Sequence, residues 1–427
     1  MTSVELPPAR FGTLRGRLLL PAADTPRVDV IDDGLCSFGA DGRLLTVSKA
    51  PADCAVPETR PGAVWLPGFV DTHIHFPQTR ILGSATGPLL DWLQRSVFPE
   101  EARFTERAYA AAVAEEFCAS LAAQGTTCAS IFSASDPGAT EVLFAALARW
   151  GHRALVGLTL MDRGAPPAVC VPAERALAAS ERLIGDWHGH DDGRLRFAVT
   201  PRFALSCTPK LLDGAARLAE RHGLLMQTHL SENRAELEAT AAQFPKCSDY
   251  FAVYADHGLA TARSLFAHCI WLSDGEWDRL AATGGAVSHC PDSNFFLGSG
   301  AMPLARPLHR GIRVGLGTDV GAGRTFSLRR VAASAYDAAL ITGANADAES
   351  LLWRATAGGA AALGLDDTIG RLAPGLMGDV IAIDLPEWLD ATDRHALFDA
   401  LVFRRDADPV AAAYVAGRRL ASGVTPR

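Results

Sequence analysis

The sequence has no long apolar run: none of its stretches approaches the roughly 18 uninterrupted apolar residues that a membrane-spanning helix needs. It also has no cluster of basic side chains, because its 40 lysines and arginines are scattered and the net charge is -8. A protein that binds a polyanion concentrates positive charge on one face. These two absences exclude a membrane protein and argue against nucleic-acid binding as the main function.

The nine cysteines form no C-x-x-C pair, and their number is odd. They indicate neither a disulfide framework nor a thiolate zinc site, so we interpret them as reduced thiols. Near the N-terminus the one short apolar stretch, Leu18 to Ala23, is interrupted by Pro21. Because the apolar core of a signal peptide is missing, we predict a cytoplasmic protein.

Both ends of the chain are rich in short β-type runs. Residues 11–66 contain such runs, separated by Gly and Pro, and no amphipathic segment of helix length. Similar runs return after Gly370. We therefore predict that residues 1–66 and 371–427 together form one small, discontinuous β-sandwich domain. Its strands are expected at Thr13–Leu20, Arg27–Ile31, Arg43–Val47, Asp379–Asp384, Ala400–Phe403 and Ala411–Ala416.

Between these ends, strand-like runs alternate with helical ones. The helix Lys210–Arg221 is well marked, with Thr208 as N-cap, Pro209 at the first helical position and Gly223 at the end. Eight such units, without a G-x-G-x-x-G motif after the first strand, predict an α/β fold with a (β/α)8 TIM-type barrel over residues 67–370. The strands are expected at Leu66–His75, Thr126–Phe132, Ala154–Leu160, Leu195–Thr200, Leu224–His229, Ser264–His268, Ala286–His289 and Val314–Thr318.

Two histidines lie two residues apart in the first of these strands, so His73 and His75 project from the same face. At the C-terminal end of a barrel strand, that face is directed toward the mouth where barrel active sites lie. A single polar residue there is more often structural, but three further candidates end three other predicted strands. They are His229, His268 and Asp319.

Imidazoles with one carboxylate suit zinc, while iron(II) or another divalent ion stays open as an alternative. Such a cation lowers the pKa of a bound water molecule toward about 7 and so supplies hydroxide. Asp319 is then the expected acceptor of the water proton. Glu232, three residues after His229, is a candidate to carry a proton to the substrate, and His268 to stabilise a tetrahedral centre.

Four motifs resemble the metal-dependent amidohydrolase superfamily over nearly the whole chain: PGFVDTHIH at 67–75, HLSEN at 229–233, the strand-end His268, and GLGTDV at 315–320. More specific stretches are similar to the guanine deaminase family within its mononuclear branch. These stretches are His75–Gln78, Pro88–Leu93, Phe98–Glu101, Thr200–Phe203, Gln227–Arg234 and His289–Asn294.

The resemblance implies hydrolytic deamination of guanine to xanthine and ammonia in purine breakdown, by a homodimer with one zinc per subunit. It implies His268 next to the attacking water and Glu232 as proton carrier. The metal ligands that the resemblance implies are His73, His75, His229 and Asp319.

The two-metal branch of the superfamily uses a carboxylated lysine at the end of the fourth strand. This chain has only three lysines, and none falls there: Lys49 and Lys246 are outside the strand, and Lys210 is inside the following helix. One metal is therefore expected. The H-x-E and P-C-x-x-C zinc site of cytidine deaminases is also absent.

Three residues are candidates for reading the substrate. Arg202 carries only donors, so it complements a carbonyl such as guanine O6 and disfavours the amino group that adenine carries there. Gln78 can read a mixed edge, and Phe203 offers a ring and a backbone N–H. Structural roles for all three stay open, and Trp92 and Phe98 are interpreted as wall packing.

Two positions depart from the family pattern: Asp292, where Asn or Thr is usual, and Arg324, after a less glycine-rich turn. Because both are expected near the mouth, they leave open another purine, a pterin or a triazine ring as substrate. His289 is expected behind the metal ligands. An inert scaffold on the same fold is the remaining alternative, and the complete set of candidate ligands argues against it.

Overall fold

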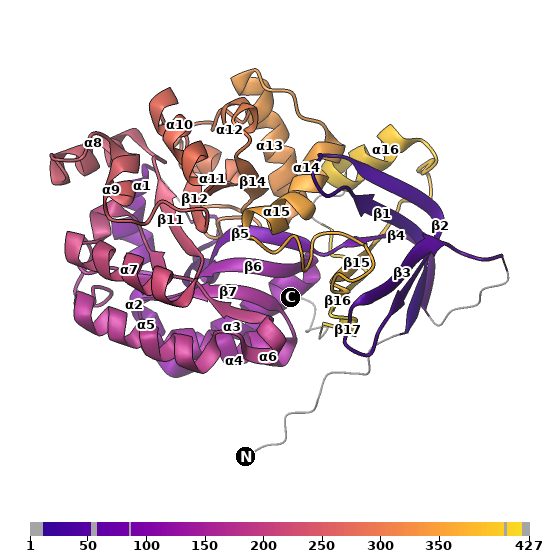
Figure 1. Ribbon diagram of the computed structural model, residues 1–427, viewed down its shortest axis with the longest axis horizontal. Coiled ribbons are helices and arrows are strands. Elements are labelled where there is room, and N and C mark those ends of the chain that lie inside the picture. The colour runs from indigo at the N-terminus through magenta and orange to yellow at the C-terminus, as the bar shows by residue number, and fades with distance from the viewer. Residues whose placement is uncertain (1–11, 53–57, 85–86, 405–407, 421–427) are drawn as a thin grey trace, which may run out of the picture.

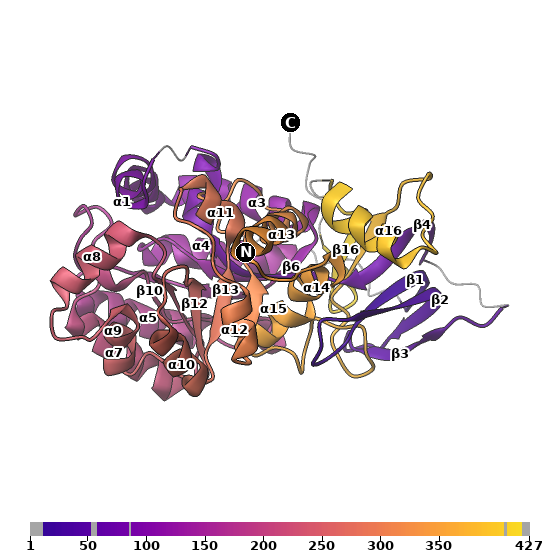
Figure 2. The ribbon, with the colours of Figure 1, turned by 90° about the horizontal axis from the view of Figure 1, so that it is seen from above.

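The computed structural model describes residues 12–52, 58–84, 87–404 and 408–420. Its strands form a seven-stranded sheet, two four-stranded parallel sheets and a two-stranded pair. In both views of the ribbon, strands β1 to β3 lie at one end of the molecule, and helices flank the parallel strands over the rest (Figures 1 and 2). Within these described ranges, no helix has the length and apolarity to cross a membrane. The cysteines there are free thiols, and Cys54 lies outside them.

The parallel strands pair with their neighbours in sequence, in the orders β5-β6-β7-β9 and β11-β12-β13-β14. Nearly all of their side chains are buried, as expected for strands covered on both faces. They overlap the eight strands predicted between residues 66 and 318. Their bounds are β5 Phe69–His75, β6 Thr126–Phe132, β7 Arg153–Gly157, β9 Leu195–Phe197, β11 Met226–Leu230, β12 Ser264–His268, β13 Ala286–His289 and β14 Arg313–Leu316.

Two predicted strands are interrupted. Strand β7 is followed by the short β8 (Thr159–Leu160), and β9 by the short β10 (Thr200–Pro201); β8 and β10 pair with each other.

Hydrogen bonds connect the two larger parallel sheets at both borders. At one border a bridge joins Val199 to Met226. At the other, the amide of Asp319 donates to the carbonyl of His73 at 2.8 Å, which brings two candidate ligands together.

The helices mostly follow the strands. Helix α7 begins and ends as predicted: the Thr208 side chain accepts the amide of Leu211, and Gly223 ends the helix with a φ of 63°. The α-helices are α1 Leu89–Trp92, α2 Phe98–Ala102, α3 Arg107–Ala123, α4 Pro137–Trp150, α5 Ala173–Trp187, α6 His190–Gly193, α7 Pro209–His222, α8 Arg234–Gln243, α9 Tyr250–Asp256, α10 Asp274–Thr283, α11 Pro291–Phe296, α12 Ala305–His309, α13 Leu328–Thr342, α14 Ala348–Arg354, α15 Ala357–Ala362 and α16 Arg394–Asp399. Shorter 3-10 and π segments are η1 Phe76–Ile81, η2 Leu93–Val97, η3 Arg103–Thr105, η4 Ala204–Ser206 and η5 Ala400–Arg404.

The seven-stranded sheet combines strands from both ends of the chain, in the order β17-β16-β15-β4-β1-β2-β3. The antiparallel pairing of β15 with β4 joins the C-terminal strands to the N-terminal ones. These described strands form a single sheet, so the two-layered sandwich stays a prediction. The bounds are β1 Thr13–Pro21, β2 Val28–Phe38, β3 Leu44–Lys49, β4 Glu58–Pro67, β15 Val380–Asp384, β16 Ala412–Val415 and β17 Arg418–Arg419.

The predicted strand Ala400–Phe403 is wrong. These residues form the π-helical segment η5, which continues α16. Leu401 and Val402 are buried in the apolar cluster that also contains residues of α13. A four-residue apolar run carries too little periodicity to separate a strand from a helix, and tertiary packing decided between them.

The predicted strand Leu66–His75 is divided at Gly68. Strand β4 ends at Pro67 in the seven-stranded sheet, and β5 begins at Phe69 in the parallel sheet. A Cβ atom on Gly68 would collide with the side chain of Thr127. Glycine therefore permits the close approach at which the chain passes from one sheet to the other.

Candidate active site

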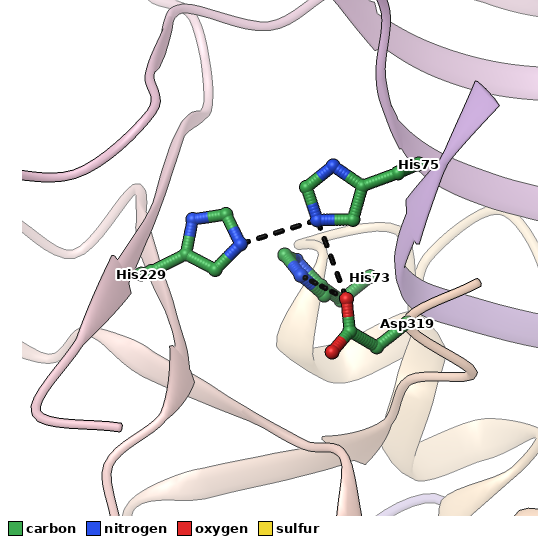
Figure 3. A group of neighbouring side chains, drawn as sticks. All are labelled: His73, His75, His229 and Asp319. Carbon is green, nitrogen blue, oxygen red and sulfur yellow. Dashed lines mark hydrogen bonds and ion pairs between the residues drawn. The ribbon is translucent and has the colours of Figure 1, made fainter. Parts of the chain in front are cut away.

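Four of the predicted site residues converge on one point, from the ends of β5 and β11 and from the segment after β14. One donor atom of each lies within 4.8 Å of the others. Figure 3 shows the side chains pointing toward one another. The Nε2 atoms of His75 and His229 are 3.1 Å apart. Asp319 Oδ1 lies 3.2 Å from Nε2 of His73 and 3.3 Å from Nε2 of His75.

Neighbouring groups orient these side chains. The buried carboxylate of Asp71 accepts the amides of His73 and Thr318, both at 3.1 Å, and so ties β5 to the segment that carries Asp319. The Nδ1 atom of His229 lies 2.6 Å from the carbonyl oxygen of Arg202. A carbonyl oxygen only accepts, so Nδ1 carries the hydrogen and Nε2 presents a lone pair to the cluster.

The donor set fits a divalent cation. Burial lowers the pKa of His75 to about 3 and that of His229 well below its usual range, so these imidazoles are neutral. Burial opposes ionisation of Asp319, but the adjacent His73 and His75 hold its pKa well below the usual range. The buried Nε2 of His73 has no aligned hydrogen-bond partner within the described residues. Neutral imidazoles and one carboxylate are the ligands that zinc takes.

A second group of side chains lies next to the cluster. His268 Nε2 is 3.5 Å from Glu232 Oε2 and 3.8 Å from Asp319 Oδ2. Its Nδ1 donates to Asn294 Oδ1 at 2.8 Å, which directs Nε2 toward the two carboxylates. Burial, together with the charge of Asp319, raises the pKa of Glu232 to about 8. The hydroxyl of Ser299 donates to Glu232 Oε1 at 3.1 Å.

His268 and Glu232 line a cavity. Its lining includes all of the predicted site residues except His73, and also Trp92, which was predicted as wall packing. Phe98 packs below the guanidinium of Arg202, 5.6 Å from the ring centroid. The full lining is His75, Gln78, Leu89, Trp92, Leu93, Arg202, Phe203, His229, Glu232, Glu236, His268, Leu297, Asp319 and Ala322.

Sequence reasoning missed several residues of this site. Glu236 accepts the amides of Glu232 and Asn233 at 2.9 and 3.1 Å. The N-x-x-E spacing of a capping box could have found it. Glu101, at the end of the Phe98–Glu101 stretch, accepts a hydrogen bond from Arg202. Its contacts are long-range, so no local spacing identifies it.

Other predicted neighbours lie apart from the substrate cavity. Asp292 and Arg324 are not among its lining residues. His289 is buried, with neither ring nitrogen hydrogen-bonded within the described part of the chain. Glu232, which does line the cavity, precedes helix α8 and is 2% exposed.

The fold and the His/Asp cluster define a hydrolase of the amidohydrolase type. The profile of the amidohydrolase family matches residues 64–420, which is most of the chain. The chain therefore belongs to the amidohydrolase family.

Within that family, several of the similar proteins are guanine deaminases. The chain is 41% identical over 375 residues to the probable guanine deaminase of Deinococcus radiodurans, covering 84% of this chain and 85% of that one. The solved guanine deaminase of Escherichia coli superposes with a TM-score of 0.90 at 32% identity, covering 97% and 100% of the two chains. A guanine deaminase from C. acetobutylicum, solved with guanine in its active site, gives 0.89 at 29% identity, covering 96% and 100%.

Proposed function

We propose that this chain removes the amino group of guanine by hydrolysis and releases xanthine and ammonia. The observation that carries the proposal is the composition of one cavity. Its wall presents three of the four donors of the His/Asp cluster together with Arg202 and Gln78, which can read a purine edge. The likeness to guanine deaminases over most of the chain supports the same substrate.

Zinc is the ion that we propose, with one per subunit held by His73, His75, His229 and Asp319. The position of Lys210 supports a single ion, since this lysine lies on helix α7, is exposed and pairs with Glu174, and so is not placed to bridge two ions. When bound, the cation lowers the pKa of a water molecule and so supplies a nucleophile at neutral pH.

The chain's own residues move the protons. The carboxylate of Asp319 is ionised and takes a proton from the attacking water at Oδ2. The raised pKa of Glu232 lets its carboxyl carry a proton at neutral pH and deliver it to a ring nitrogen of the substrate. His268 Nε2 lies close to both carboxylates and holds the attacking oxygen in place. The amino group then takes the proton held by Asp319 and leaves as ammonia, while the hydroxyl of the tetrahedral centre returns its proton to Glu232, so both carboxyl groups end in their starting states.

Substrate choice follows from the groups on the cavity wall. The guanidinium of Arg202 donates to the carbonyl oxygen of guanine, and adenine instead offers an amino group, which leaves two donors facing each other. The ring of Phe203 gives the flat base an apolar contact, since Phe203 lines the cavity and is 7% exposed. Gln78 adds a further polar contact.

We further infer that the eight parallel strands close into one (β/α)8 barrel, spanning residues 67–370. Residues 1–66 and 371–427 then form the smaller β domain. The bonds between the two parallel sheets at both borders support this division. A cytoplasmic location, a homodimer and a place in purine breakdown stay predictions.

The test is a turnover assay of zinc-replete protein with guanine, adenine, cytosine and the triazine ammeline. Loss of guanine absorbance with matching xanthine and ammonia release is the expected result, and adenine is expected to stay unchanged. Turnover of ammeline without guanine would reject the substrate and keep the hydrolytic site. No turnover by protein that holds its metal would reject the function.

A further inference from the structure

One buried carboxylate contacts both polar residues that the proposed function assigns to the purine edge. Glu101, on helix α2, is 3% exposed, as is Arg202. Nη1 of Arg202 lies 2.8 Å from both carboxylate oxygens of Glu101. The carboxamide Nε2 of Gln78 donates to Oε1 of the same carboxylate at 3.3 Å.

These contacts determine how Gln78 presents its amide. While Nε2 donates to Glu101, Oε1 accepts the backbone amide of Gly321 at 3.1 Å. Nitrogen and oxygen are therefore assigned by their partners, since a carboxylate only accepts and a backbone N–H only donates. Gln78 is left with the second hydrogen on Nε2 and the second lone pair on Oε1, and these two contacts fix the direction in which that hydrogen is offered to a ligand.

The same carboxylate also sets the donors of Arg202. Within the described residues, the hydrogen bonds of this guanidinium are all made by Nη1. Nε and Nη2 are left as donors. The charge of Arg202 is compensated by Glu101, so the wall offers N–H groups without an excess positive charge. Such a wall suits a neutral ring that carries acceptors on one edge, such as a carbonyl oxygen next to a ring nitrogen.

We infer that Glu101 is the positioning residue for substrate selection: it holds Arg202 and Gln78 with their donors toward the purine edge. This inference rests on the proposed function, because it names how the same cavity tells an oxo-purine from an amino-purine. Glu101 contacts no reacting atom and acts through its two neighbours.

The first variant is Glu101→Gln, which keeps the shape and removes the charge. The amide of the new glutamine has a single acceptor oxygen. Its NH₂ group therefore faces either the NH₂ of Gln78 or the guanidinium of Arg202, and the side chain that meets this NH₂ group loses its orientation. We expect KM for guanine to rise about 10- to 100-fold, because hydrogen bonds to charged groups contribute that much, while kcat changes less. We also expect the guanine-to-adenine ratio of kcat/KM to fall.

The chain offers a matched control in the adjacent residue. Glu100 lies on the same helix and is 6% exposed, but it bonds to Arg103 and to Tyr109, away from the cavity lining. We expect Glu100→Gln to keep KM and the purine ratio within about twofold, even if its melting temperature falls, because bonds outside the cavity do not contact the substrate.

A double-variant cycle separates positioning from general packing. If Glu101 acts mainly through Arg202, then adding Glu101→Gln to Arg202→Met raises KM by much less than it does in the wild type. Should Glu101→Gln fail to fold, Glu101→Asp retracts the carboxylate by one methylene and keeps the charge. It is expected to raise KM by an intermediate factor.

The outcomes that overturn the role of Glu101 differ from those that reject the proposed function. Wild-type protein that does not use guanine rejects the function itself. Wild-type protein that uses guanine, with an unchanged KM and purine ratio in Glu101→Gln, overturns the positioning role. Equal losses in Glu100→Gln and Glu101→Gln, or full additivity with Arg202→Met, overturn it as well.

Discussion

Asp292 and Arg324 form a hydrogen-bonded ion pair. The carboxylate Oδ1 of Asp292 lies 2.6 Å from Nη2 of Arg324, and its Oδ2 accepts the backbone amide of the same arginine at 2.7 Å. Asp292 is 1% exposed. These are the two positions at which the chain departs from the family pattern. They compensate each other, and the pair holds the loop that begins with Gly321.

This pairing predicts that Arg324→Ala affects stability more than substrate choice. Asp292 keeps its backbone hydrogen bond but loses the guanidinium, so we expect the free energy of unfolding to fall by about 1–2 kcal/mol. The guanidinium is partly exposed to solvent, which limits the loss. Urea denaturation measures the stability, and kcat/KM for guanine and adenine measures the selectivity. A change of tenfold or more in their ratio would contradict the prediction.

Glu232→Gln tests the proton carrier. Glutamine keeps the shape and can still accept the hydrogen bond from Ser299 at Oε1, but it carries no transferable proton. We expect the variant to retain its metal and to lose about 100- to 10,000-fold in kcat, the range of general acid–base catalysis. Metal analysis and the guanine assay are run on one preparation. An active variant would disprove this role of Glu232.

Removing one donor of the cluster tests the metal site. We expect His229→Ala protein to contain much less metal than the wild type after growth with zinc, since three donors remain where four converge. Activity is expected to fall with the metal, and chelation of the wild type followed by added zinc to restore it. His222→Ala is the control, because His222 pairs with Glu181 at the end of helix α7. Equal metal content in both variants would refute the ligand assignment.

The raised pKa of Glu236 predicts that the free energy of unfolding depends on pH. Burial, together with the charge of Glu232, raises the pKa of Glu236 from 4.5 to about 7. Between these pH values the folded chain binds a proton that the unfolded chain has lost. The contribution of this group is therefore complete below pH 4.5 and is lost as the pH rises through 7, by about 3 kcal/mol in all.

The variant Glu236→Gln stays neutral and can still accept the amide of Glu232. We expect its stability relative to the wild type to increase from pH 5 to pH 8, by up to about 3 kcal/mol. Urea midpoints at the two pH values measure the difference. Glu238→Gln, an exposed position on the same helix, is expected to show no such trend. A parallel pH profile for Glu236→Gln and wild type would contradict the raised pKa.

Local patterns predicted much of the fold. Strands such as Thr126–Phe132 and Ser264–His268 coincide with their predicted bounds, and so does the start of helix α7 at Pro209. Each of these elements has its own apolar run or capping residue. The segment Ala400–Phe403 has an apolar run of only four residues, which does not separate a strand from a helix, and its helical form depends on packing next to helix α13.

The sequence by itself determined the donor types and the strand ends on which they lie, because the two-residue period of a strand places His73 and His75 on one face. Only the tertiary structure decided which side chains orient the candidate substrate residues. Glu101 and Arg202 are 101 residues apart, and Gln78 reaches Gly321 across 243. Periodicity encodes which face of an element is buried, whereas contacts between distant elements depend on how those faces pack.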